Sequence, residues 1–153
     1  MKDLSVEEKI ELLKTAQDGV LAFSLNDTPY CIPFGFVYID EALFLSFFPK
    51  GRKWECFQQN KKVCFSVYGW NDDHTQWSSV VVDGEIEQID DMNTVELVVR
   101  ANIDKMGLDP ETYLDKRMDY YRKAADNPAA LKTFKITIKS MGGKTMHTLL
   151  GRD

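Results

Sequence analysis

The sequence contains few of the residues that most often carry out chemistry by themselves. There are two histidines, His74 and His147, and three cysteines. The cysteines form no C-x-x-C pair and their number is odd, which favours free thiols in a reducing compartment over a disulfide framework. The two histidines lie far apart and have no cysteine or carboxylate at ligand spacing, so we expect no metal site. No Ser-His-Asp or Cys-His arrangement is apparent from the spacing.

Long apolar runs and an excess of positive charge are also missing. The longest apolar run, residues 42–48, is much shorter than the roughly 20 residues of a membrane-spanning helix. The first five residues do not resemble a signal peptide. The net charge of −5 argues against nucleic acid as a general partner. We therefore expect a cytoplasmic protein without a membrane or nucleic-acid partner, in which any anion is held by a local cluster of basic residues.

Length and composition are those of an ordinary globular domain. The chain has 153 residues, of which 44% are hydrophobic and 28% are charged. A chain of this length buries roughly 70% of the surface that it exposes when unfolded, so it can form a core without a metal or disulfide. We expect one domain over residues 1–153.

Hydrophobic periodicity predicts a mainly β protein with helices at its edges. Ser5 and Glu8 form a capping-box pattern at the start of a helix. The expected helices cover residues 5–17, a short segment ending near 60, 91–106 and 110–125. The expected strands cover residues 20–25, 30–39, 43–48, 61–68, 77–89 and 132–141, with a turn at Gly142-Gly143 before a short strand over 144–149. Five to seven strands joined mostly as hairpins predict a largely antiparallel, barrel-like sheet.

The strongest local pattern is basic and lies at the expected start of a helix. Lys50, Arg52 and Lys53 surround Gly51. Cations are unfavourable beside the unpaired N–H groups of a helix start unless an anion lies between them. Arg52 can bind a phosphate through two hydrogen bonds and Lys53 can add a point charge. The alternative is a solvated basic loop.

Two further segments are suited to a ligand when combined with this cluster. In residues 32–36, Pro33 and Gly35 fall on one side of the expected strand and the larger side chains fall on the other, so a flat ligand can approach the backbone. In residues 77–84, a hydroxyl at the start of a long strand can reach a phosphate or a ring carbonyl. Taken singly, the first segment is also explained by an edge strand with a bulge, and the second by an ordinary strand start.

The order and spacing of these segments resemble the FMN-binding split barrels of the pyridoxamine 5′-phosphate oxidase-like family. The likeness is to a small bacterial branch that includes nitroimidazole-resistance proteins. The segments that carry it are residues 19–22 (GVLA), 29–34 (PYCIPF), 43–47 (LFLSF), 51–53 (GRK), 60–65 (NKKVCF) and 79–84 (SVVVDG), with a closing strand and Gly-Lys ending at 136–144.

The resemblance implies an antiparallel split barrel that binds FMN at the interface of a homodimer. The backbone of Ile32, Pro33, Phe34, Gly35 and Phe36 would line the isoalloxazine ring. The remaining implied cofactor contacts come from other elements. They are Ser46 and Phe47 beside the phosphate and ribityl chain, Lys50, Gly51, Arg52 and Lys53 at the phosphate, Ser79 at the flavin, and Trp77 with Lys144 at the cofactor of the partner subunit.

Two departures from the family pattern narrow the expected activity. Ser46 stands where many members of the nitroimidazole-resistance branch have a histidine, which argues against nitroimidazole reduction. The arginines and the histidine that bind substrate phosphate in pyridoxamine 5′-phosphate oxidases have no clear counterpart, which argues against pyridoxine oxidation.

We therefore expect an FMN-dependent oxidoreductase of unknown small-molecule substrate and electron donor. The flavin would carry the electrons, so no catalytic side chain is assigned. The alternatives are a non-catalytic flavin carrier or sensor, and a haem-binding split barrel in which His147 has a role.

Overall fold

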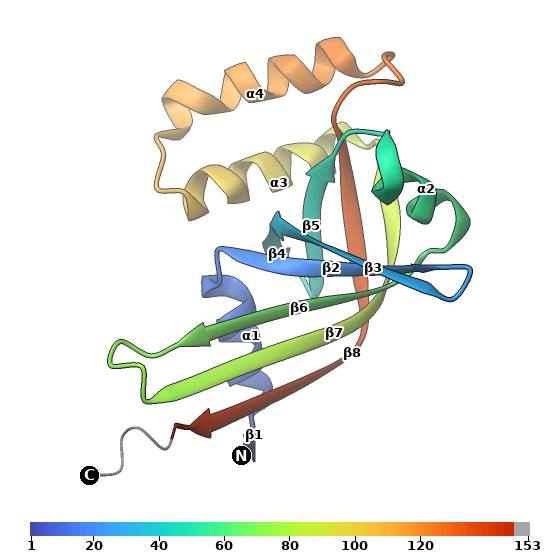
Figure 1. Ribbon diagram of the computed structural model, residues 1–153. Helices are drawn as coiled ribbons and strands as arrows, with labels where there is room; N and C mark the ends of the chain where they lie inside the picture. Colours follow the sequence, from blue (N-terminus) through green and yellow to red (C-terminus); the bar gives the residue numbers. More distant parts are fainter. Residues whose placement is uncertain (149–153) are drawn as a thin grey trace.

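The computed structural model describes residues 1–148, which form eight strands and four helices (Figure 1). The helices are α1 (Val6–Thr15), α2 (Gly51–Gln59), α3 (Met92–Lys105) and α4 (Pro110–Ala124). The strands are β1 (Lys2–Asp3), β2 (Asp18–Leu25), β3 (Thr28–Gly35), β4 (Val37–Ile39), β5 (Ala42–Phe47), β6 (Lys62–Trp70), β7 (Gln76–Ile89) and β8 (Lys132–His147). None of these helices is long and apolar enough to cross a membrane.

One antiparallel sheet contains all the described strands. Its order is β3-β2-β6-β7-β8-β5-β4, and β1 adds to the far end of β8. The sheet does not close, because β3 and β4 form its two ends. These two end strands follow one another in the chain and are separated only by Phe36. An open antiparallel sheet whose two end strands follow one another in the chain is a split barrel, which confirms the expected fold class.

The core lies between the curled walls of the sheet. Alternate residues of β6 and β7 are buried, among them Phe65, Val80 and Val82. The Phe47 and Phe134 rings stack with their centroids 3.8 Å apart. Trp54 and Phe57 of α2 pack against Phe134, and Phe57 also packs against Phe47, so α2 covers one end of the barrel. Burial of each large apolar side chain contributes about 1.5–3 kcal/mol to folding.

Helices α3 and α4 form an arm outside the sheet (Figure 1). They pack on one another through a small core of Val95, Val99, Ile103 and Met118. Val98 on another side of α3 packs against Val37, Ala42 and Phe44 of β4 and β5. The arm is therefore attached to the β4 end of the sheet. Its two helices confirm those predicted for residues 91–106 and 110–125.

The structure corrects three expectations about the strands. Residues 30–39 form two strands, because the backbone leaves the sheet at Phe36. Gly142 and Gly143 make no turn and stay paired with Val81 and Val80, so β8 is a single strand and the described strands number eight. Leu149, where the expected last strand ended, lies outside the described residues.

The glycine at 143 is explained by packing instead of a turn. A Cβ at Gly143 would lie 2.8 Å from the Lys9 side chain and 3.0 Å from that of Leu4. Helix α1, which carries the predicted capping box between Ser5 and Glu8, can therefore lie close against β8.

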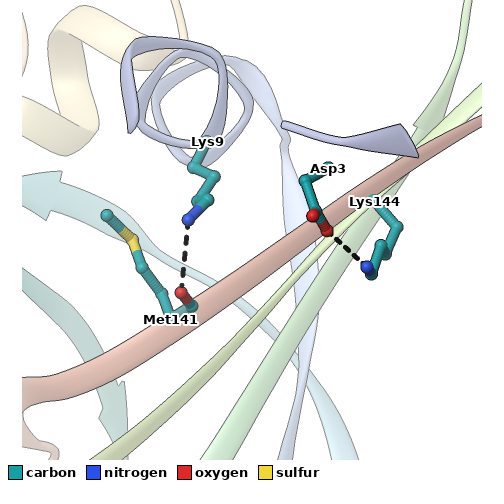
Figure 2. Close-up of polar contacts among 4 residues, drawn as sticks. All are labelled: Asp3, Lys9, Met141 and Lys144. Atoms are coloured by element: carbon teal, nitrogen blue, oxygen red, sulfur yellow. Dashed lines mark hydrogen bonds and ion pairs between the residues drawn. The ribbon is translucent and has the colours of Figure 1, made fainter. Parts of the chain in front are cut away.

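The N-terminal segment is fastened to β8 by two polar contacts (Figure 2). Lys9 Nζ donates to the Met141 carbonyl oxygen at 3.4 Å, and Lys144 pairs with Asp3. The ammonium of Lys144 lowers the pKa of the Asp3 carboxyl, so the carboxylate stays charged to lower pH than usual.

Candidate cofactor site

The basic cluster at residues 50–53 does lie at the start of a helix. Lys50 is the N-cap of α2, with extended backbone, and its side chain makes no capping hydrogen bond in the described part of the chain. The first turn contains no acidic residue. Gly51 has a φ of +78°, a left-handed conformation that glycine adopts without strain. The start of α2 therefore combines three neighbouring cations with a helix end that has no side-chain cap within the described residues, which is an arrangement suited to an anion.

The cations of this cluster are held by aromatic rings. The guanidinium carbon of Arg52 lies 4.3 Å from the centroid of Tyr30, on β3. The ammonium of Lys50 lies 5.4 Å from the ring centroid of Phe48. Arg52 and Lys50 are exposed and Lys53 is half-buried. The stacking orients Arg52 while leaving its N–H donors available for a ligand.

Strand β3 lies at an edge of the sheet and presents two different faces. Tyr30, Ile32 and Phe34 are half-buried toward the core, whereas Pro33 and Gly35 are exposed. Among the described strands, β3 pairs only with β2, so its other edge is open. The register with β2 is continuous from 28 to 35, so the strand has no bulge. The predicted separation of small and large side chains in residues 32–36 is confirmed.

A groove of about 360 Å³ lies beside this strand, on the outer face of the sheet. Its lining residues come from the end of α1, β2, β3 and β6, and they are Ala16, Gln17, Asp18, Gly19, Val20, Pro33, Ser66 and Tyr68. This volume falls within the range of small-molecule sites, about 300–1,000 Å³.

Other predicted residues lie on two different parts of the fold. Ser79 pairs with Lys144 across β7 and β8, and Trp77 pairs with Met146. These side chains are half-buried or exposed, and Lys144 is engaged by Asp3 (Figure 2). Ser46 is half-buried on β5. The Phe47 ring is buried in the core, so its backbone is the part that remains to face a ligand.

The outer face of the sheet also carries exposed large apolar side chains. Tyr68 and Trp70 on β6, Val81 on β7 and Met146 on β8 are all at least 40% exposed. The ring of Trp77 lies 6.3 Å from that of Tyr68. We call these five residues the outer apolar face. Exposed apolar side chains gathered on neighbouring strands are typical of an interaction surface.

Two charged groups near the site were not found from the sequence. Lys105, on α3, reaches the β3–β4 junction and donates to the Phe36 carbonyl oxygen at 2.6 Å. Burial lowers the pKa of Lys105, and the Asp18 carboxylate opposes that shift. Asp18 itself, which directly follows the helix expected over residues 5–17, lines the groove. Nothing in local periodicity indicates that residues 18 and 105 are neighbours, because the contact depends on how the arm docks.

The thiol of Cys64 is not suited to act as a nucleophile. Burial raises its pKa, and the neighbouring Asp83 carboxylate raises it further. It therefore stays a neutral thiol at neutral pH. Within residues 1–148 no group of three or more histidine, cysteine or acidic side chains is placed to hold a metal ion.

Comparison with known proteins places the chain in a family. The model of the pyridoxamine 5′-phosphate oxidase family matches residues 5–145. A comparison with curated proteins gives no match. The chain belongs to the pyridoxamine 5′-phosphate oxidase family.

Solved structures agree with this assignment. An FAD-binding protein from Mesorhizobium loti is 26% identical with a TM-score of 0.66, over 95% of this chain and 97% of that one. A candidate 5-nitroimidazole antibiotic resistance protein from Bacteroides thetaiotaomicron is 22% identical with a TM-score of 0.72, over 94% and 86%. An FAD-binding protein from Mycobacterium smegmatis is 15% identical with a TM-score of 0.67, over 97% and 100%.

Proposed function

We propose that this protein binds FMN and is an FMN-dependent oxidoreductase of a small molecule. The observation that carries the proposal is the start of α2, where an uncapped helix end is surrounded by Lys50, Arg52 and Lys53. Such a helix end favours a phosphate group, and a flavin mononucleotide ends in one. The flavin-binding proteins among the structural neighbours support the same class of ligand.

The positions of the helix start and the groove fit a ligand with an anionic end and a flat end. Arg52 stacks on Tyr30, on the core-facing side of β3, whereas Pro33 lines the groove on the outer face, so a ligand that reaches both would cross the open edge of this strand. A strand rises about 3.3 Å per residue, so these two positions on β3 are about 10 Å apart along the strand. Because β3 has an open edge and small outward side chains, its backbone is accessible to a ligand between Tyr30 and Pro33. Arg52, Lys53 and the N–H groups of α2 would hold the phosphate, and residues 32–36 would hold the ring.

The chain's own part in the reaction would be binding, orientation and electrostatics. A bound flavin supplies the electron-transfer chemistry, so the protein needs no side-chain nucleophile. Backbone N–H groups and cations close to a flavin ring favour its anionic reduced form.

We further propose that the protein is a homodimer that buries the outer apolar face. Tyr68, which belongs to this face, also lines the groove. Covering the face with a second copy would remove apolar area from water and close the groove on one side.

The free cysteines Cys31, Cys56 and Cys64 support the cytoplasmic location proposed from the sequence.

The deciding experiment is an absorption spectrum of the purified protein before and after addition of FMN and removal of the excess. A two-band flavin spectrum that stays with the protein is expected, and chromatography of the released cofactor distinguishes FMN from FAD. A protein that retains no flavin contradicts the proposal, and a sharp haem band would favour the haem-binding alternative. Reduction by a nicotinamide followed by turnover of an added acceptor separates an enzyme from a carrier.

A further inference from the structure

The ammonium of Lys105 makes two contacts with a single residue of the sheet. Its Nζ donates to the Phe36 carbonyl oxygen at 2.6 Å and lies 4.0 Å from the centroid of the Phe36 ring. The Phe36 side chain is 2% exposed, and its ring packs edge-on against Phe65 with centroids 4.9 Å apart. A residue of the helical arm is thus anchored to the core of the sheet.

Phe36 is also the point where the backbone leaves one strand and enters another. Ladder pairing ends at Gly35 in β3 and resumes at Val37 in β4. A carbonyl at such a break cannot rely on a neighbouring strand for its hydrogen bond, and a buried carbonyl without a partner is costly. Lys105 supplies that partner from outside the sheet.

This junction adjoins the groove. Gly35 pairs with Asp18, and Asp18 lines the groove. The carboxylate of Asp18 also interacts electrostatically with the Lys105 ammonium. Lys105 therefore holds the Phe36 end of the segment 32–36, and its positive charge lies near Asp18, which lines the groove.

We propose that Lys105 is a positioning residue for the flavin ring, through which the α3–α4 arm fixes the backbone of residues 32–36 and adds positive charge beside it. This inference rests on the proposed function. It gives the arm a role at the cofactor in addition to its packing on β4 and β5.

The test compares Lys105→Met with a matched control, Lys61→Met. Lys61 has the same chemistry elsewhere: its Nζ donates to the Phe57 carbonyl oxygen at 2.6 Å and lies 3.4 Å from the Phe57 ring centroid. Burial lowers its pKa too. Both variants lose one ammonium and one hydrogen bond to a backbone carbonyl, so a general loss of stability would appear in both. Lys105→Arg serves as the conservative rescue.

Two measurements separate positioning from stability. In flavin-free protein, Lys105→Met should raise amide hydrogen exchange in residues 32–37, whereas Lys61→Met should raise it only near the end of α2. In FMN-loaded protein, Lys105→Met should move the flavin midpoint potential to a more negative value and weaken FMN binding about two- to thirtyfold. Lys61→Met should leave the potential unchanged, and Lys105→Arg should restore it toward that of the unaltered protein.

The possible failures are distinguishable. If the unaltered protein retains no flavin, the proposed function is wrong and no flavin-positioning role remains; the exchange measurement then decides only whether Lys105 fixes the backbone of residues 32–36. Unchanged exchange in residues 32–37 of Lys105→Met overturns the inference. Equal potentials for the Lys105→Met and Lys61→Met proteins overturn it as well, even though FMN is bound.

Discussion

At the scale of single residues, Arg52 is the side chain whose proposed role in phosphate binding is most open to test. It is exposed and stacks on Tyr30, so its truncation should not disturb the core. A hydrogen bond to a charged partner contributes about 1.5–3 kcal/mol. Arg52→Ala should therefore weaken FMN binding about ten- to a hundredfold in a fluorescence titration.

Arg117 provides the control for this substitution. It lies on α4 with its guanidinium carbon 6.0 Å from the Tyr113 ring centroid, so Arg117→Ala also removes an arginine from beside a tyrosine. Arg117→Ala should leave FMN affinity unchanged. Unchanged affinity in the Arg52→Ala protein would show that the phosphate is bound somewhere else.

The Asp3–Lys144 ion pair makes a prediction about pH. Because Lys144 lowers the pKa of Asp3, the pair stabilises the attachment of β1 at neutral pH. This contribution is lost as pH falls through the lowered pKa, below about pH 4. Asp3→Asn should speed amide exchange in residues 2–9 at pH 7, and this difference from the unaltered protein should shrink steadily as the pH falls below about 4. A difference that persists at low pH would contradict the assignment.

At the scale of elements, the two adjacent glycines of β8 have different environments. A Cβ at Gly143 would meet Lys9 and Leu4, whereas a Cβ at Gly142 would meet nothing within 4 Å. Gly143→Ala should therefore lower the free energy of unfolding by about 1–3 kcal/mol in urea denaturation. Gly142→Ala is the matched control and should have little effect. Equal loss in both variants would mean that the close approach of α1 to β8 is not the cause.

Most elements could be predicted because their signals are local. The capping box at Ser5 and Glu8 marks the start of α1, and alternation of Phe134, Ile136 and Ile138 marks the start of β8. The misassigned turn shows the limit of this approach. A Gly-Gly pair is typical of a turn, but here the need for glycine at 143 comes from α1, which is more than 120 residues away in the chain.

The candidate site was predictable to a similar degree. The cations at Lys50, Arg52 and Lys53 are adjacent in sequence, and their place at a helix start follows from the glycine and the periodicity after it. The contribution of Lys105 could not be predicted, because it depends on the docking of a helix 69 residues away from Phe36. Burial of Phe47 on Phe134 likewise depends on the pairing of β5 with β8.

At the scale of the whole molecule, the main prediction is the homodimer. Trp70 is 46% exposed on the outer apolar face, and Leu97 is 55% exposed on α3. Placing a charge in an apolar interface is unfavourable because the charge loses its water. Trp70→Glu should therefore shift the sedimenting species from dimer toward monomer, whereas Leu97→Glu should not. A flavin-bound monomer of the unaltered protein would contradict the dimer, and an intact Trp70→Glu dimer would place the interface on another face.

The open edge of β3 has a consequence for the behaviour of the protein at high concentration. An unpaired strand edge is a template on which another chain can add a strand, and such addition leads to aggregation. Pro29 and Pro33 remove two N–H donors from β3, and they are four residues apart, so both gaps fall on the same edge. A strand that paired with this edge would lack a hydrogen bond from every second N–H group of β3 over this stretch. The protein can thus leave an edge free for a ligand while denying it to further copies of the chain.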